Sequence, residues 1–352
     1  MKEDPNLIFT LRAISKHAER AFEHSHNKRY YVPPHPLVIA AASRESSVAT
    51  NIGDEDGEGD GDGLKTWNTK GKGDVSKDFN HQLRFTWDNM PKTGAIFGSN
   101  PKTCDVILGS SKDGISSSHF RITFNDQDRL VLIDSSTHGT AVSYDGQARK
   151  DKRKNPQDRT RNKPRNKLND FTWILFPEVD DKRVIIGEDI NELPNAPVIE
   201  FSVEVTDPES CDDEYKRYLR SYLDEMRKAI PFGLNIDSQK TTTGQTESHS
   251  PKQHPKQRPI WIDREEIRSG AFAIVYRAIN VSTGKWYAAK TFMRNKYRKE
   301  WDREVAILRK VSHDHIIKFE DHDVEHKWPR LIMEYLPLGN LAYQNGISRI
   351  TE

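Results

Sequence analysis

The chain has 352 residues, of which 30% are charged and only 34% hydrophobic, and its formal net charge is +1. This hydrophobic fraction is too small for one compact globule. We therefore expect folded modules joined by solvated linkers. The near-zero charge and the absence of a long apolar run exclude general attraction to nucleic acid or membrane, so neither is expected as a specific partner. Two cysteines, Cys104 and Cys211, exclude a disulfide framework and indicate a reducing, intracellular setting in the nucleus or cytoplasm.

Residues 1–82 contain two segments of different character. Apolar side chains recur near helical spacing within residues 1–30 and predict a short amphipathic helix: Leu7, Leu11, Ile14, Ala18 and Phe22. Residues 45–80 are polar and glycine-rich, and we expect this acidic segment to be disordered because it cannot bury apolar surface. The run Asp54–Asp62 lacks the flanking helices and terminal Glu of a calcium loop, so no metal site is expected there.

Residues 83–206 have the pattern of short β-strands. Clusters of Gly, Asn, Asp and Pro separate the apolar segments, which indicates an all-β sandwich. The expected strand segments are 84–87, 120–124, 130–133, 172–176, 184–186 and 198–205. A basic insertion at 149–167 fits a solvated loop, and the alternatives are a nuclear import signal or a nucleic-acid patch.

Residues 207–259 predict a helix followed by a linker. Apolar side chains share one helical face: Tyr215, Tyr218, Leu219, Tyr222, Leu223 and Met226. Acidic residues begin this segment and basic residues end it, as the helix dipole favours. Such a stripe packs on a neighbouring domain more often than on a separate partner protein. Residues 235–258, rich in Thr, Ser, Gln, Lys and Pro, are expected to form the linker.

Three sequence segments within the β region carry a candidate phosphate site. They are Ile96–Leu108, Ile115–Phe120 and Asp134–Val142, and their order and spacing resemble a forkhead-associated (FHA) domain, a sandwich whose loops bind phosphothreonine peptides. A phosphate is bound by hydroxyl and backbone N–H donors together with a cation. By this resemblance, His119 braces the fold and Gly139 permits a tight turn. The resemblance implies these phosphopeptide-binding residues: Ser99, Ser116, Ser117, Thr137 and His138.

The sequence departs from the FHA pattern at two of these positions. Ser99 stands where the family usually has Arg, and His138 stands where it usually has Asn. Lys102 or Lys112 is a candidate for the missing cation, although a lysine lacks the planar fork of an arginine. The alternative is an FHA scaffold that no longer reads phosphate or that binds an unphosphorylated partner.

The last part of the chain, residues 260–352, contains six elements in one order. They are a loop at Gly270, a strand lysine, a helix glutamate, a Ser312–His313 turn, a segment after Met333, and Gly339–Leu341. This order resembles the N lobe of a eukaryotic Ser/Thr protein kinase, an antiparallel sheet with one helix, which binds ATP. The resemblance implies these ATP-binding residues: Ile267, Gly270, Val275, Ala288, Lys290, Glu304, Met333, Glu334 and Leu336.

In this resemblance Lys290 pairs with the α- and β-phosphates of ATP, and Glu304 holds Lys290 by an ion pair. Met333 is the gatekeeper, and the hinge follows it. Of the three usual loop glycines only Gly270 is present, with Arg268 at the first position and Ala273 at the third.

The sequence contains neither a His-Arg-Asp nor an Asp-Phe-Gly string. Those motifs supply the Asp that accepts the substrate proton and the Asp that holds Mg²⁺. We therefore expect residues 1–352 not to transfer phosphate, to bind ATP weakly or residually, and to lack the magnesium site. This interpretation treats the chain as a kinase N lobe truncated after the hinge.

An FHA domain followed by a kinase domain resembles the checkpoint kinases of fungi and animals, in which the phosphopeptide module brings the kinase to phosphorylated partners after DNA damage. One interpretation is a phosphothreonine-dependent binding module joined to an ATP-binding lobe. A second is an active Ser/Thr kinase whose C lobe lies outside this sequence. A third is a pseudokinase-like regulator that docks on another kinase. The expected partners are phosphothreonine-containing proteins and, in the third case, another kinase.

Overall fold

A computed structural model describes residues 4–34, 81–148, 171–187, 198–229, 259–293, 298–323 and 328–339. The expectations for the acidic segment 45–80, the basic insertion 149–167 and the linker 235–258 fall outside these residues. The chain divides into two compact units.

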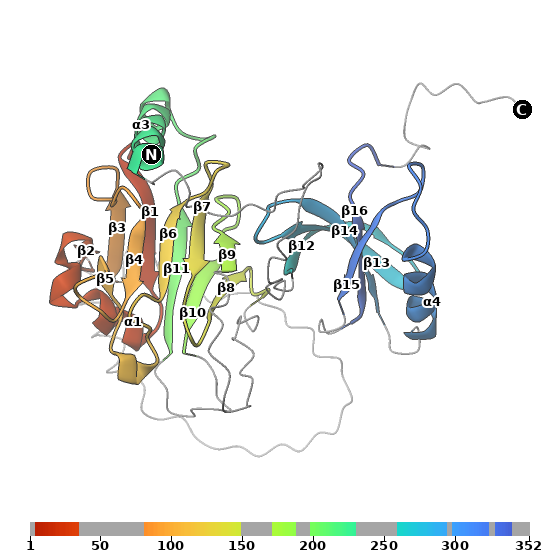
Figure 1. Ribbon diagram of the computed structural model, residues 1–352, viewed down its shortest axis with the longest axis horizontal. Helices are drawn as coiled ribbons and strands as arrows, with labels where there is room; N and C mark the ends of the chain where they lie inside the picture. The colour runs from red at the N-terminus through yellow and green to blue at the C-terminus, as the bar shows by residue number, and fades with distance from the viewer. Residues whose placement is uncertain are drawn as a thin grey trace, which may run out of the picture. The chain divides into compact units, whose positions relative to one another are not determined.

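The first unit is a β-sandwich (Figure 1). One sheet has the order β2-β3-β1-β11-β10-β8 and consists of β1 (Leu7–Ala13), β2 (Tyr31–Val32), β3 (Gln82–Thr86), β8 (Thr140–Tyr144), β10 (Lys182–Ile186) and β11 (Ile199–Val205). The other has the order β5-β4-β6-β7-β9 and consists of β4 (Ala95–Gly98), β5 (Val106–Ile107), β6 (Phe120–Phe124), β7 (Leu130–Asp134) and β9 (Phe171–Ile174). The predicted all-β sandwich is confirmed.

Aromatic side chains fill the space between the two sheets. The ring of Phe9 stacks on Phe85 with centroids 4.4 Å apart, and Phe97 stacks on Phe120 at 4.6 Å. Phe85 and Phe97, which belong to different sheets, join the two pairs at 5.9 Å. All four side chains are fully buried. Because rings of this size bury a large apolar area, this row is a main source of the sandwich's stability.

The N-terminal segment differs from the predicted amphipathic helix. Residues Leu7–Ala13 form β1, which lies between β3 and β11, and only Lys16–Phe22 is helical (α1), capped by the Ser15 hydroxyl. A strand in the middle of a covered sheet is buried on both faces, so its apolar run also fits helical spacing. Pairing with β3 and β11 decides the conformation, and neither partner is local in sequence.

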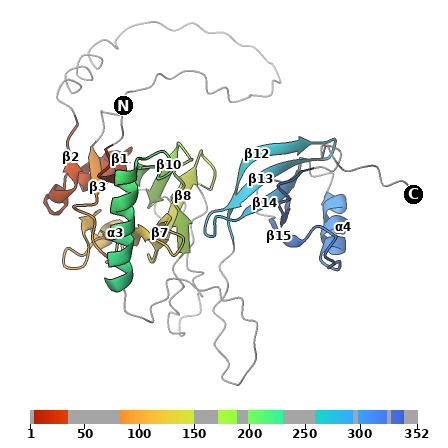
Figure 2. The ribbon, with the colours of Figure 1, turned by 90° about the horizontal axis from the view of Figure 1, so that it is seen from above.

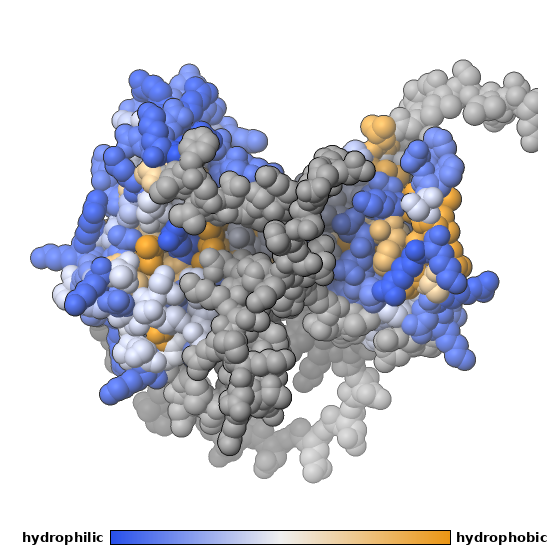
Figure 3. Space-filling model, in the orientation of Figure 1, coloured by the Kyte–Doolittle hydropathy of each residue, from blue (hydrophilic) through white to orange (hydrophobic). Residues whose placement is uncertain are grey.

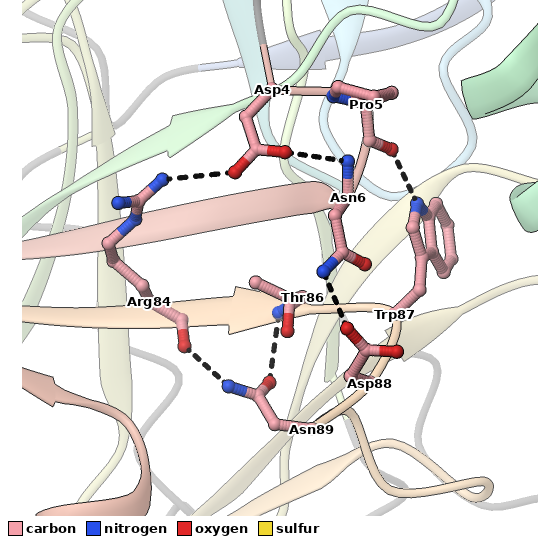
Figure 4. Close-up of polar contacts among 8 residues, drawn as sticks. All are labelled: Asp4, Pro5, Asn6, Arg84, Thr86, Trp87, Asp88 and Asn89. Carbon is pink, nitrogen blue, oxygen red and sulfur yellow. Dashed lines mark hydrogen bonds and ion pairs between the residues drawn. The ribbon is translucent and has the colours of Figure 1, made fainter.

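Side chains fasten the start of β1 to the turn after β3 (Figure 4). The indole N–H of Trp87 donates to the carbonyl oxygen of Pro5 at 3.2 Å, and the Asn6 amide donates to the Asp88 carboxylate at 2.6 Å. Asn89 closes the turn itself by bonding to the backbone of β3. Pro5 and Asn6 are therefore an integral part of the sandwich.

Helix α3 (Asp213–Ala229) packs on the sandwich, as the apolar stripe predicted (Figure 2). Its buried side chains are Tyr215, Tyr222, Leu223 and Met226. The Trp87 ring lies 5.3 Å from Tyr215 and 5.6 Å from Tyr222, and the Tyr222 hydroxyl donates to the carbonyl of Pro91 at 2.5 Å. Burial raises the pKa of Tyr222 to about 12. The helix thus uses its apolar face within its own unit.

The second unit is a five-stranded sheet with one helix, the architecture expected for a kinase N lobe. Its order is β12-β13-β14-β16-β15, and its elements are β12 (Trp261–Ser269), β13 (Ala273–Asn280), β14 (Trp286–Phe292), α4 (Arg298–Leu308), β15 (Phe319–Asp323) and β16 (Arg330–Glu334). Helix α4 packs on the sheet through Trp301 and Val305, which join a cluster with Phe292 and Leu331. In the described part of the chain, no helix has the length and apolar character of a membrane span.

Candidate functional site

The candidate phosphate site lies where the loops after β4, β5 and β7 meet. The Ser99 N–H donates to the Ser116 carbonyl oxygen at 3.0 Å, and the Thr137 N–H donates to the Ser116 hydroxyl oxygen at 3.0 Å. The hydroxyl groups of Ser116 and Thr137 are 3.5 Å apart. Ser116 therefore connects the other two loops and places its hydroxyl beside that of Thr137, and hydroxyl groups are donors suited to an oxyanion.

Gly98 allows the first two loops to approach so closely. A Cβ atom at this position would lie 2.6 Å from the carbonyl oxygen of Ser117 and 2.8 Å from that of Ser116. Both atoms belong to the backbone, so the clash could be relieved only by moving the loop that carries Ser116.

A buried aspartate shapes the loop that carries Thr137. The Asp134 carboxylate accepts from the N–H groups of Ser136 at 3.0 Å and Thr140 at 2.7 Å, and burial raises its pKa. The Ser136 hydroxyl accepts from the N–H of Gly139, which has a φ of 82°. Our sequence reasoning missed the role of Asp134, although an Asp that opens a Ser-rich turn is a recognisable signal.

His119 supports Ser116 from the interior of the sandwich. Its Nδ1 accepts the N–H of Ser116 at 3.0 Å, and the side chain is fully buried. Burial, with a smaller contribution from the charge of His138, lowers the pKa of His119 to about 3. The imidazole is therefore neutral at physiological pH, and its Nδ1 remains an acceptor.

The other predicted phosphopeptide residues lie in or next to these loops. The Ser99 hydroxyl donates to the carbonyl of Ile115 at 3.0 Å, so it holds the backbone of the neighbouring loop. Ser117 and His138 are exposed, as are both candidate cations, Lys102 and Lys112. The structure thus brings Ser99, Ser116 and Thr137 into one bonded group and leaves the charged groups at its surface.

Asn27 holds strand β5, which leads into the loop that carries Ser116. Sequence reasoning also missed this residue. Its side chain is fully buried; the amide nitrogen donates to the carbonyl of Ile107 at 2.9 Å, and its oxygen accepts the N–H of Ile107 at 2.8 Å. It therefore pairs with edge strand β5 as a neighbouring strand would. A single asparagine in a polar segment gives no local sign of this role.

A cavity of about 430 Å³ lies beside the same loops. Its lining residues are His24, Ser99, Pro101, Ile107, Gly109 and Ser110. Neither Ser116 nor Thr137 is among them, so the cavity adjoins the bonded group and is not its centre.

The candidate nucleotide site is built around an ion pair in the second unit. The Lys290 ammonium on β14 lies 2.7 and 2.8 Å from the two carboxylate oxygens of Glu304 on α4. The two side chains are 28% and 33% exposed, so solvent reaches both. The pair joins sheet to helix and holds a cation that solvent can reach, which suits the binding of a phosphate chain.

Strand register brings further predicted residues beside Lys290. Val275 lies opposite Lys290, and Ala288 lies opposite Met333, so these four share one region of the sheet. Ala288 and Met333 are each 8% exposed, whereas Ile267 and Leu336 are 48% and 56% exposed. The apolar part of the predicted site is therefore assembled from β13, β14 and β16, while Ile267 and Leu336 lie at its surface.

The turn between β12 and β13 leaves room for a phosphate group despite Arg268. A Cβ atom added to Gly270 would meet only the carbonyl oxygen of Ala273 within 4 Å, at an ordinary 3.5 Å. Phe272 at the tip is 60% exposed. The open turn, the partly exposed cation of Lys290 and the apolar strand residues together fit an adenine nucleotide. By the same fit, Gly270 and Lys290 would contact its phosphates, and Val275, Ala288 and Met333 its base.

The Glu334 side chain is already used within the protein. Its carboxylate accepts from the N–H of Lys318 at 2.7 Å, and its own N–H donates to the carbonyl of Lys318 at 3.0 Å. Within the described ranges, no group of three or more His, Cys, Asp or Glu side chains is arranged to hold a metal ion.

Comparison with known proteins identifies both regions. The FHA domain family matches residues 95–159, and the protein kinase domain family matches residues 261–350. The serine/threonine-protein kinase RAD53 of Saccharomyces cerevisiae is 26% identical over 249 residues, which cover 70% of this chain and 26% of the yeast protein. The serine/threonine-protein kinases atg1 of Schizosaccharomyces pombe and ATG1 of Kluyveromyces marxianus are 31% and 36% identical over 87 and 84 residues.

These matches cover part of each relative. The two shorter ones span 24% and 22% of this chain and 10% of each relative, so the chain has about a tenth to a quarter of its relatives' length in common with them. A crystal structure of Rad53 1-466 in complex with AMP-PNP aligns with a TM-score of 0.34 and 20% identity, covering 70% of this chain and 47% of that one. The two family matches fall on the two units that carry the candidate sites, and the chain therefore contains an FHA domain followed by a protein kinase region.

Proposed function

We propose that the FHA domain binds phosphothreonine peptides at Ser116 and Thr137. The observation that carries this proposal is the bond from the Thr137 N–H to the Ser116 hydroxyl, which joins two loops into one donor group. Ser99 replaces the arginine usual in the family, and the exposed lysines Lys102 and Lys112, from the loops after β4 and β5, are the candidate cations for the ligand. The geometry favours an anionic ligand because the hydroxyl groups of Ser116 and Thr137 meet there, and hydroxyls donate to phosphate oxygens.

Titration with a phosphothreonine peptide and its unphosphorylated counterpart tests this binding. Ser116→Ala removes a hydroxyl that would bond to a charged oxygen, so affinity should fall by about 10- to 100-fold. Ser118→Ala is the matched control: this exposed serine lies two positions away, and its variant should bind normally. Equal binding of the two peptides, or undiminished binding by Ser116→Ala, would contradict the proposal.

We further propose that the kinase region binds ATP through Lys290 and the apolar residues of β13, β14 and β16. The Lys290–Glu304 pair supports this, since it holds a cation in place at the surface of the sheet. Lys290→Met should lower ATP affinity about tenfold or more, because a phosphate loses a charge-assisted contact. The matched control is Lys318→Met, which removes an exposed lysine from the same unit.

For the complete function, the proposal is a phosphoprotein-binding module of a checkpoint-type Ser/Thr kinase. Similarity to RAD53 over 70% of the chain supports it. Residues 1–352, expressed alone, should bind peptide and nucleotide without transferring phosphate, since the printed sequence has neither a catalytic His-Arg-Asp nor an Asp-Phe-Gly string. Transfer of radiolabelled phosphate from ATP to a generic substrate by this protein, abolished in Lys290→Met, would overturn that expectation.

A further inference from the structure

An arginine of the kinase region lies against two aromatic rings. The Arg277 guanidinium on β13 is 3.9 Å from the ring centroid of Trp286 on β14. It is also 5.2 Å from the ring centroid of Tyr335, the first residue after β16. A cation over the faces of aromatic rings is attracted by their π electrons, most strongly by Trp. The Arg277 side chain therefore links strands β13 and β14 to the segment that follows β16.

Strand register places this cluster next to the candidate nucleotide residues. Arg277 lies directly opposite Ala288, one step along the same face from the pair Val275 and Lys290. Ala288 also lies opposite Met333 on β16. Trp286 precedes Ala288 by two residues and Tyr335 follows Met333 by two residues, so both continue the same face.

Other contacts of Arg277 explain its position less well. Its Nη1 is 3.8 Å from the Glu265 carboxylate, but that side chain is 68% exposed, and an exposed ion pair at this distance contributes little. The Arg277 side chain itself is only 33% exposed. Stacking on the two rings is therefore its principal interaction.

The residues that follow Tyr335, from 336 to 339, are exposed. Leu336 and Leu338 are 56% and 78% exposed. Glu334, on the other side of Tyr335, is anchored by its bonds to Lys318. Tyr335 is thus one point at which the segment after β16 contacts the sheet, and Arg277 provides that contact.

We propose that Arg277 is a positioning residue for nucleotide recognition, which fixes the segment after β16 through Trp286 and Tyr335 and thereby sets a preference for adenine. This inference rests on the proposed binding of ATP. Backbone groups held at a fixed distance can distinguish the edge of one base from that of another, and a segment that moves cannot. The contact acts on the base, so it should have a small effect on the binding of the phosphates.

The test compares ATP and GTP binding by residues 1–352 with calorimetry. Arg277→Met should lower ATP affinity roughly three- to tenfold and leave the weaker GTP affinity nearly unchanged. Arg277→Lys keeps the charge without the planar group and should recover only part of the loss. Arg309→Met is the matched control, because it removes another guanidinium near an aromatic ring, 5.9 Å from Phe319, and should change neither affinity.

The pathway of the effect is tested by combining Arg277→Met with Tyr335→Leu. If both act through one contact, the double variant should bind ATP no more weakly than the weaker single variant. Equal loss of ATP and GTP affinity in Arg277→Met would indicate a general electrostatic or stability effect and overturn the inference, as would unchanged binding of both. If the unaltered protein binds neither nucleotide, the proposed ATP binding fails and this inference fails with it.

Discussion

The two candidate sites are held in place by different means. At the phosphate site, the loops that carry Ser116 and Thr137 are held by backbone N–H groups. These N–H groups donate to the buried side chains of His119 and Asp134 and to the Ser116 hydroxyl. At the nucleotide site, side chains reach across strands and to a helix: Lys290 to Glu304, and Arg277 to two rings. The peptide site therefore depends on backbone bonds and buried groups, and the nucleotide site depends on contacts between partly exposed side chains.

The strands of the first unit are also more deeply buried than those of the second. Strands β7 and β8 of the sandwich are buried along their whole length, whereas β12 is exposed over its last five residues and β15 is nowhere fully buried. Figure 3 shows apolar surface on the second unit, which has exposed Ile307, Val311 and Ile316. A site on a well-packed scaffold loses stability when its core is altered, whereas a site on a thinly packed sheet responds mainly in its affinity.

The largest expected effect comes from shortening the aromatic row of the sandwich. Phe97→Ala should lower the free energy of unfolding of the first unit by about 3–5 kcal/mol, because the ring stacks on Phe120 and is fully buried. Phe272→Ala, at a position 60% exposed in the second unit, should cost about 0.5 kcal/mol or less. Denaturant unfolding with hydrogen exchange resolved by unit measures both. Similar losses would break the proposed contrast in packing.

Asn27→Ala should have the next largest effect. It leaves the N–H and carbonyl of Ile107 without their partner, so we expect a loss of about 2–3 kcal/mol. Because β5 leads into the loop of Ser116, phosphopeptide affinity should fall as well. Lys28→Ala changes an exposed neighbour and is the control. Full peptide affinity in a destabilised Asn27→Ala protein would show that β5 does not position the site.

Acid should weaken the sandwich through His119. The folded-state pKa is lowered to about 3, so between the unfolded value of about 6.5 and that pKa only the unfolded state binds this proton. Stability therefore falls as pH decreases below about 6.5, by about 1.4 kcal/mol per pH unit. Unfolding measured at several pH values between 7 and 5.5 tests this.

His119→Gln isolates that contribution. The raised pKa of Asp134 acts in the opposite direction, because protonation is then favoured in the folded state, and this effect is present in both proteins. The slope of stability against pH should be smaller in His119→Gln. Identical slopes in the two proteins would show that His119 does not control the acid sensitivity.

The smallest expected effect on stability belongs to the ion pair of the nucleotide site. A double-mutant cycle with Lys290→Met and Glu304→Gln should give a coupling of about 0.2–1 kcal/mol in unfolding, since both groups are partly exposed. The same variants should change ATP affinity much more. A coupling of several kcal/mol would show that the pair is a structural element of the second unit, which would contradict the expected small contribution of partly exposed side chains to its stability.

Local patterns were sufficient for much of this fold. Alternating apolar residues predicted β3, β6, β7, β10 and β11, and the apolar stripe at 215–226 predicted α3 and its packing. Motif spacing also selected Ser116, Thr137, Lys290 and Glu304, which the structure brings together in two bonded groups. These features depend on neighbours in sequence or on a few residue types at fixed distances, so the sequence carries them directly.

The exceptions all involve partners far apart in sequence. Strand β1 pairs with β11, nearly two hundred residues later, and its apolar run alone fits a helix equally well. Asn27 bonds to Ile107 of β5, 80 residues later in the chain, and Arg277 on β13 contacts the ring of Tyr335, which follows β16. Sequence by itself therefore determined which chemical groups are available and where strands and helices can form. Tertiary structure decided which segments pair and which polar groups those pairings bury, because the free energy of burial and hydrogen bonding depends on residues that meet only when the chain is folded.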